Sequence, residues 1–334
     1  MAALAILIAL LFRWRHEGFD WSLFATTFRR LNPGWLLAAT VLGLATYYGR
    51  VLRWAVLMRP VCSRPNLWGL FSATAIGFSA IVVFGRPGEI VRPYLISLRE
   101  RVPFSSQAAA WLLERMYDML AALLIFGIAL SQVEKSGANL SPAFAFALEA
   151  GGRTAAVIGF TCLAILLLLR QFAEPARKRL TDALKVLPEK WHKGAEELVC
   201  EFVRGIQSTR DLPSLILTLF YTALEWALIA ACYIALFRAF PGLSSFNIRD
   251  ILIFMGFVSF GSVLQLPGIG GGMQLVAMVV LTELFRVPLE LATGMALLIW
   301  LFTFVVILPV GAFMLCHEGL TWQKIKLMED RATL

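Results

Sequence analysis

Apolar runs about as long as a bilayer is thick recur along this chain, and they constrain its fold more than any other feature. A transmembrane helix needs roughly 20 mostly apolar residues. Charged residues make up only 16% of the sequence, against about a quarter in soluble domains. The sequence therefore predicts an all-α, polytopic membrane protein. We expect full spans at 1–13, 34–58, 105–130, 153–170, 212–237 and 289–316.

Two further apolar regions, 67–98 and 248–286, are each interrupted near the middle by a Pro-Gly pair. Proline removes a backbone donor and glycine permits a sharp turn, so we expect each helix to break there. Such a break survives at membrane depth only inside protein or beside water. The expected hinges are Pro87, Gly88, Pro267, Gly268, Gly270 and Gly271.

The connection 171–211 carries more basic residues than any other loop, with eight Lys/Arg beside seven Asp/Glu. Because Lys and Arg accumulate on the cytoplasmic side, we place this connection and the tail 317–334 in the cytoplasm. Each interrupted region then begins and ends on one side of the membrane and forms a re-entrant hairpin. The two hairpins enter from opposite sides, as in the inverted repeats of transporters. A single membrane domain, 1–316, is expected, with halves at 34–170 and 212–316.

Charged side chains gather at the tip of the first hairpin and in the span that follows it. They are Arg86, Glu89, Arg92, Glu114, Arg115 and Asp118. Arg115 and Asp118 are three apart and can pair on one helical face. Glu89 and Arg92 can pair in the same way if the chain is helical there. Glu114 and Asp118 share a face and repel one another unless one is protonated or a cation lies between them.

These charges support two interpretations. In the first, they neutralise one another and pin the hairpin to the next helix. In the second, they line a polar cavity open to the cytoplasm, where Arg86, Arg92 and Arg115 contact an anion. Guanidinium groups bind phosphate oxygens through paired hydrogen bonds, and lipid headgroups are the phosphates that a membrane cavity meets. Arg50 and Arg53 are interpreted as topology anchors at the cytoplasmic interface.

Two other acidic residues lie outside this group. Glu225 is a lone acid within the span 212–237 and could face the cavity. Glu283 stands near the outer end of the second hairpin, where we expect it to be solvated.

Four motifs occur in a fixed order: G-R-x-x-R-W at 49–54, G-R-P-G-E-x-x-R at 85–92, E-R-x-x-D at 114–118 and L-P-G-x-G-G at 266–271. Over nearly its whole length the chain resembles the lysylphosphatidylglycerol synthase transmembrane family. The resemblance implies a bacterial or archaeal inner-membrane protein linked to lipid translocation. It leaves the cargo open, since family members also occur with glycolipid, hopanoid and polyprenyl-linked pathways.

The chain departs from the family pattern at two positions. Gln274 stands where the family usually has a glutamate, and Trp300 where it tends to have an arginine. Gln274 can hydrogen-bond a headgroup but cannot titrate. The sequence ends at Leu334 without a soluble domain, so we do not expect the aminoacyl-transferase activity of fused members.

We therefore predict a translocase that moves an anionic phospholipid or a lipid-linked headgroup across the inner membrane. The residues expected to bind the substrate are Arg86, Glu89, Arg92, Glu114, Arg115, Asp118 and Gln274. Five scattered cysteines and three distant histidines indicate neither a disulfide framework nor a metal site. We expect no catalytic residues, no cofactor and no nucleic-acid partner.

Two alternatives from other classes stay open. The first is a non-catalytic accessory protein that holds a glycosyltransferase or another lipid-modifying enzyme. Its docking surface would be an apolar helical face in the connection 171–211, which could instead lie on the membrane surface or on the protein's own helices. The residues of this face are spaced by three and four: Leu180, Leu184, Leu187, Trp191, Ala195, Leu198, Phe202 and Ile206. The second is a membrane enzyme acting on lipid phosphates, for which the sequence offers no pair of base and nucleophile.

Overall fold

The computed structural model describes residues 19–136, 142–184, 189–206, 211–263 and 271–319. These residues are helical wherever they form regular structure, and no strand lies among them. The expected span 1–13 and the expected hinges Pro267, Gly268 and Gly270 lie outside the described residues.

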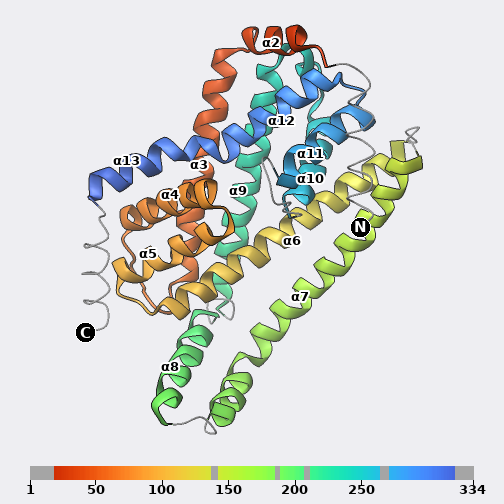
Figure 1. The fold of residues 1–334 in the computed structure, drawn as a ribbon. Helices are drawn as coiled ribbons and strands as arrows, with labels where there is room; N and C mark the ends of the chain where they lie inside the picture. Colours follow the sequence, from red (N-terminus) through yellow and green to blue (C-terminus); the bar gives the residue numbers. More distant parts are fainter. Residues whose placement is uncertain (1–18, 137–141, 185–188, 207–210, 264–270, 320–334) are drawn as a thin grey trace. The chain divides into compact units, whose positions relative to one another are not determined.

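The helices appear in Figure 1 under their labels. Their bounds are α2 (Trp21–Arg29), α3 (Pro33–Leu57), α4 (Leu67–Phe84), η1 (Arg86–Ile90), α5 (Val91–Glu100), α6 (Phe104–Ser136), α7 (Pro142–Leu184), α8 (Glu189–Ile206), α9 (Leu212–Ala239), η3 (Pro241–Leu243), α10 (Ile248–Val263), α11 (Gly271–Val279), η4 (Val280–Leu284), α12 (Leu289–Thr303), η5 (Val305–Ile307) and α13 (Leu308–Glu318).

Among the described residues, six helices are long and apolar enough to cross a membrane. They are Pro33–Leu57, Leu67–Phe84, Phe104–Val133, Ala145–Phe172, Leu212–Ala239 and Leu289–Glu318. Five of them match expected spans, and the polytopic α-helical class is confirmed. The sixth, α4, was expected to be one arm of the first hairpin, but its 18 residues are long enough to cross by themselves. The re-entrant hairpins therefore stay a prediction.

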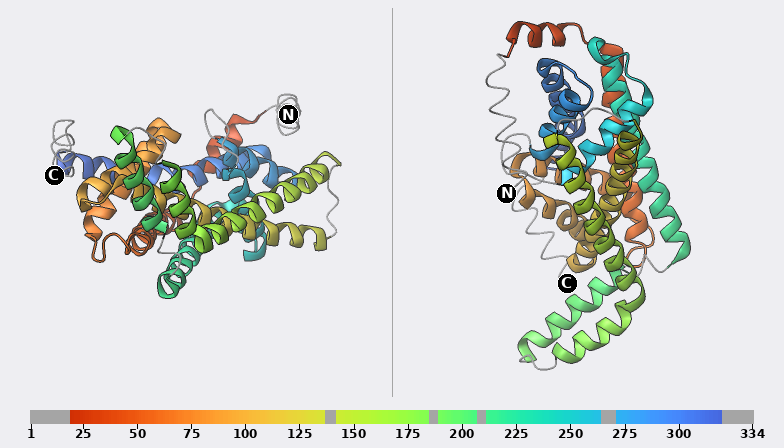
Figure 2. Two further views of the ribbon diagram at one scale, coloured as in Figure 1. Left: turned by 90° about the horizontal axis from the view of Figure 1, so that it is seen from below. Right: turned by 90° about the vertical axis from the view of Figure 1, so that its right-hand side faces the viewer.

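Two helices extend well beyond their expected spans. Helix α6 continues to Ser136, and α7 begins at Pro142 and runs to Leu184 with Pro175 inside it. Much of the expected outer loop and of the cytoplasmic connection is therefore helical. The last part of α7 and α8 lie side by side, as Figure 2 shows.

The chain folds into two compact units, each assembled from three stretches. Unit 1 comprises residues 1–42, 119–160 and 229–303, and unit 2 comprises residues 43–118, 161–228 and 304–334. Because of this interleaving, α3, α6, α7 and α9 each contribute residues to both units.

In unit 1, the short helix α2 begins at an N-cap. The Asp20 carboxylate accepts hydrogen bonds from the backbone N–H groups of Leu23 and Ser22. These bonds, the one from Leu23 foremost, lower the pKa of Asp20 because they stabilise its charged form. Helix α2 packs on α12, where Phe28 lies beside Gly294. Helices α10 and α11 also pack against each other in this unit.

Helix α11 ends in the π-helical turn η4, which carries Glu283. This side chain is buried, with 7% of its surface exposed, so the expectation of a solvated Glu283 was wrong. Glu283 thus lies in a helical turn whose side chains are packed in the interior, and not at a solvated end of a hairpin.

In unit 2, α4 and α5 fold back on each other through η1, as the orange ribbons of Figure 1 show. Glycines allow this close approach. A Cβ atom added at Gly77 would lie 2.6 Å from the Cβ of Arg92, and one added at Gly88 would overlap the backbone carbonyl of Ala80. Gly85, which ends α4, has a φ of +70°, a conformation that favours glycine.

Helix α13 packs across α4, and the contact again depends on small residues. A Cβ atom added at Gly311 would overlap the Ser79 hydroxyl. The surrounding apolar core of unit 2 includes fully buried side chains of α3, α4, α5 and α6, among them Trp54, Leu70, Ile96 and Leu113.

The last turn of α8 packs on the beginning of α6. A Cβ atom added at Gly205 would lie 2.7 Å from the carbonyl oxygen of Ser106, and Ile206 is buried. This end of the apolar face expected in 171–211 is therefore covered by the protein's own helices. Most of the other side chains of that face lie outside the described part of the chain.

A substitution of Gly77 by alanine tests the close packing of α4 on α5. We expect it to lower the free energy of unfolding by about 1–3 kcal/mol, because the neighbouring atoms belong to the backbone and Cβ of Arg92. The matched control is Gly49→Ala in α3, where nothing lies within 4 Å of an added Cβ atom. It should leave stability unchanged or raise it by up to about 1 kcal/mol. Unfolding in mixed detergent micelles measures both, and equal effects would contradict the packing described.

Candidate functional site

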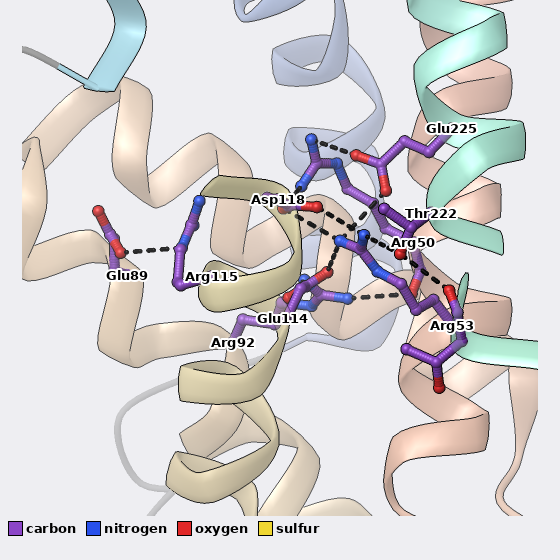
Figure 3. Close-up of polar contacts among 10 residues, drawn as sticks. Arg50, Arg53, Glu89, Arg92, Glu114, Arg115, Asp118, Thr222 and Glu225 are labelled. Carbon is purple, nitrogen blue, oxygen red and sulfur yellow. Dashed lines mark hydrogen bonds and ion pairs between the residues drawn. The ribbon is translucent and has the colours of Figure 1, made fainter. Parts of the chain in front are cut away.

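Arg53 of α3 occupies the centre of a buried ion cluster, drawn in Figure 3. Its side chain has no exposed surface. One terminal nitrogen lies 2.5 Å from Asp118 Oδ1 and donates to the Thr222 hydroxyl at 3.1 Å. The other donates to Glu114 Oε1 at 2.9 Å and lies 3.1 Å from Glu225 Oε2. A single guanidinium group therefore meets three carboxylates.

Arg92 of α5 reaches the same cluster from the hairpin. It donates to Glu114 Oε2 at 2.8 Å and to the backbone carbonyl of Arg50 at 3.3 Å. Its guanidinium group stacks over the Trp54 ring, 4.1 Å from the ring centroid. Glu114 therefore bridges two arginines, one through each carboxylate oxygen, and ties α5 to α3.

Arg50 closes the cluster on its more exposed side. Its guanidinium lies 2.5 Å from Glu225 Oε1 and 3.4 Å from Asp118 Oδ2. The side chains of Arg50 and Asp118 keep 17% and 16% of their surface exposed, whereas that of Glu225 keeps 1%. The Phe78 ring lies beneath this arginine, 5.0 Å from its guanidinium carbon.

We call this set the buried ion network. It comprises Arg50, Arg53, Arg92, Glu114, Asp118 and Glu225, and all six residues belong to unit 2. Three arginines face three carboxylates, so the network is balanced in charge. Four helices contribute to it. Spacings of three and four residues place the two arginines of α3 on one face of that helix and the two acids of α6 on one face of theirs. Removing any single partner would leave an uncompensated charge in a dry interior.

The sequence predicted part of this geometry. Glu114 and Asp118 do share a face of α6, and Arg53 lies between them, which is one of the two solutions foreseen for their repulsion. Glu225 does join the charged group. The interpretation of Arg53 as an interface anchor was wrong, because its guanidinium is fully buried.

Both expected pairs within one helix were also wrong. Arg115 does not pair with Asp118, since its Nε lies 3.4 Å from Glu89 Oε2. Arg92 pairs with Glu114 rather than with Glu89. In each case the arginine pairs with a carboxylate on another helical element and not with the acid three residues away in the sequence.

Four more residues were expected at the site or at its hinges. The side chain of Arg86 is not among those that the structure describes. Gln274 belongs to unit 1, where it is buried and its Oε1 has no hydrogen-bond partner among the described residues. Pro87 and Gly88 lie in η1, at the turn between α4 and α5.

Sequence reasoning missed Arg50 and Arg53 as members of the site. The signal that could have found them is their spacing of three residues in a span that also carries Trp54. One face of α3 thereby presents two cations and an aromatic ring, a combination that suits a buried ionic site. Within the described ranges, no three His, Cys, Asp or Glu side chains come together so as to hold a metal ion.

The fold and the network define a polytopic α-helical membrane protein with a charge-balanced ion network buried among its spans. The chain belongs to the family described as the lysylphosphatidylglycerol synthase TM region, whose sequence model matches residues 1–311. The match confirms the family indicated by the four motifs.

One characterised relative is similar over part of the chain. Glycosyltransferase AglD of Haloferax volcanii is 27% identical over 107 residues, which are 32% of this chain and 17% of that protein. The chain thus matches about a sixth of that relative's length. No solved structure is similar enough to the chain to be matched.

A double-variant cycle on Arg92 and Glu114 tests whether the network is energetically coupled. Arg92→Met alone should lower the free energy of unfolding by about 3–5 kcal/mol, because it leaves a carboxylate without one of its two cations. Adding Glu114→Gln removes that charge. The double variant should therefore lose about 1–3 kcal/mol less free energy of unfolding than the sum of the losses in the two single variants.

The control cycle uses Arg153→Met and Glu149→Gln, an ion pair along α7 whose side chains are 79% and 61% exposed. Its coupling energy should stay below about 0.5 kcal/mol. Unfolding in mixed micelles measures both cycles. Additive effects at the buried pair would contradict the coupling.

Proposed function

We propose that this protein is a lipid translocase that moves an anionic phospholipid or a lipid-linked anionic headgroup across a cell's inner membrane. The observation that carries the proposal is the buried ion network. Charges within membrane-spanning helices are expensive and usually functional. A buried ion pair is also weak evidence for stability, since apolar residues of similar volume often stabilise as well or better.

The network supplies what a mobile anion site needs. Each arginine contacts carboxylates from other helices, so a lipid phosphate that displaced one carboxylate would exchange one ion pair for another. Arg53 alone links α3 to α6 and α9. A change of partner at this residue would therefore alter how three helices are held together. Membership of a family whose description names a phospholipid synthase's membrane region supports lipid as the cargo.

The proposal places the chain among transporters rather than enzymes. Glu114 and Asp118 would hold the arginines in position, and the tail after α13 would lie in the cytoplasm. The expected partners are anionic phospholipid headgroups.

Transport is tested with purified protein in liposomes that contain a fluorescent phosphatidylglycerol and a quencher confined to the outside. We expect the wild type to move the label between leaflets faster than protein-free liposomes, with or without an imposed proton gradient. Arg53→Gln should slow this movement at least tenfold, because it removes the cation shared by three carboxylates. A wild type that moves no lipid under either condition contradicts the translocase.

Two further variants complete the design. Arg153→Gln, on the exposed surface of α7, should transport like the wild type. Asp118→Asn, at the more exposed edge of the network, removes one charge at lower risk to folding and should also slow transport. Gel filtration in detergent shows whether each variant remains monodisperse.

A second candidate function is favoured by the partial similarity to a glycosyltransferase. In this alternative the chain is a non-catalytic accessory protein that holds such an enzyme at the membrane. It predicts that glycosyltransferase activity co-purifies with the protein. Replacing Trp191 and Leu198, on the apolar face expected from the sequence, by serine and glutamine should then abolish co-purification, while Arg53→Gln should not.

A further inference from the structure

The ion pair between Arg115 and Glu89 stands apart from the buried ion network. The two side chains keep 36% and 17% of their surface exposed, and Figure 3 shows them on the side of α6 that faces away from Arg53. The contact joins Arg115 Nε to Glu89 Oε2 at 3.4 Å. That nitrogen has no hydrogen-bond partner among the described residues. The contact is longer than the two shortest contacts of Arg53, at 2.5 and 2.9 Å, and matches the 3.4 Å between Arg50 and Asp118 at the more exposed side of the network.

The position of Arg115 along α6 makes this exposure informative. The helix begins at Phe104, so Arg115 lies about 16 Å along it at 1.5 Å per residue. A partly exposed ion pair at that distance into a membrane-spanning helix needs water or a polar ligand beside it. The three arginines of the buried ion network are already balanced by three carboxylates. Arg115 is therefore better placed than Arg92 to receive an incoming anion.

The turn beside this pair is apolar and exposed. Val83, Phe84 and Ile90 show 65%, 70% and 60% of their surface. Val83 and Phe84 end α4 just before η1, and Ile90 is the last residue of η1, the element that also carries Glu89. A phospholipid has an anionic phosphate and apolar acyl chains. The cation of Arg115 suits the phosphate, and the exposed apolar side chains beside it suit the acyl chains.

We infer that Arg115 binds the phosphate group of a phospholipid in place of Glu89, while the acyl chains lie against Val83, Phe84 and Ile90. Glu89 acts as an internal competitor that holds Arg115 when no lipid is bound. This inference deepens the proposed function and rests on it for the choice of a lipid rather than free phosphate. Of the three arginines that the sequence suggested as anion contacts, Arg86, Arg92 and Arg115, it assigns the first contact to Arg115.

Opposite effects of two charge-removing variants test the inference. The probe is a fluorescent phosphatidylglycerol, bound at equilibrium to the purified protein in nonionic detergent. Arg115→Gln should weaken binding roughly tenfold, as expected for the loss of a charge-assisted hydrogen bond. Glu89→Gln should tighten binding severalfold, because it frees the arginine. Arg153→Gln is the control and should bind like the wild type.

Two ligand controls separate the phosphate from the chains. A diacylglycerol with the same chains and label should bind equally to wild type, Arg115→Gln and Glu89→Gln. Phe84→Ser should weaken phosphatidylglycerol binding but leave competition by inorganic phosphate unchanged. If inorganic phosphate binds as tightly as the lipid and Phe84→Ser has no effect, the site takes free phosphate and the lipid assignment is overturned.

The failure of this inference is distinguishable from the failure of the proposed function. If the wild type transports lipid, Arg53→Gln does not, and both Arg115→Gln and Glu89→Gln bind like the wild type, the translocase stands and the headgroup site is wrong. If binding shows the two opposite effects while the wild type transports nothing, the site stands and the translocase is wrong. Melting temperatures within a few degrees of the wild type show that the exposed variants are folded.

Discussion

The arrangement of unit 2 depends on how the charge of Arg53 is neutralised. A guanidinium group without exposed surface, inside helices long enough to cross a membrane, needs partners on every side. Its carboxylate partners lie on α6 and α9. One of them, Glu114, also binds Arg92 of α5 through its other oxygen. Four helices are thereby held by one connected set of charges.

Glycine contacts make that charge arrangement possible. Arg92 can reach Glu114 only because α5 lies close against α4, and Gly77 leaves room for the backbone of α5 at that point. Gly88 allows η1 to fold onto Ala80, and Gly311 lets α13 approach α4 in the same way. In membranes, small residues commonly serve such close helix packing, because lipid provides no hydrophobic force to press helices together. Packing and electrostatics therefore depend on each other in this unit.

The inner and outer charges of the hairpin have different physical roles. The buried ion network is balanced in charge and mostly buried, with Arg50 and Asp118 at its more exposed side. Under the proposed function, it is the part that a competing anion opens. The pair between Arg115 and Glu89 is partly exposed, and it adjoins an apolar turn. An anion would meet this outer pair first. The proposed route of a headgroup thus begins at a partly exposed ion pair and ends at the buried ion network.

The amino-acid sequence by itself determined the class of the protein, five of its six candidate spans, its family and most of the charged residues of the site. These follow from local properties: the length of apolar runs, the breaks at proline and glycine, and the spacing of charges along one helix. Only the tertiary structure decided which charges pair. Arg53 was assigned to the interface because an arginine near a span's end is usually solvated. Arg92 and Arg115 were given partners on their own helices because spacing is all that a sequence displays. In the folded chain, each of these arginines lies next to a carboxylate on another helical element. Because a charge removed from water must be paired, this neighbour determines where the buried arginine lies.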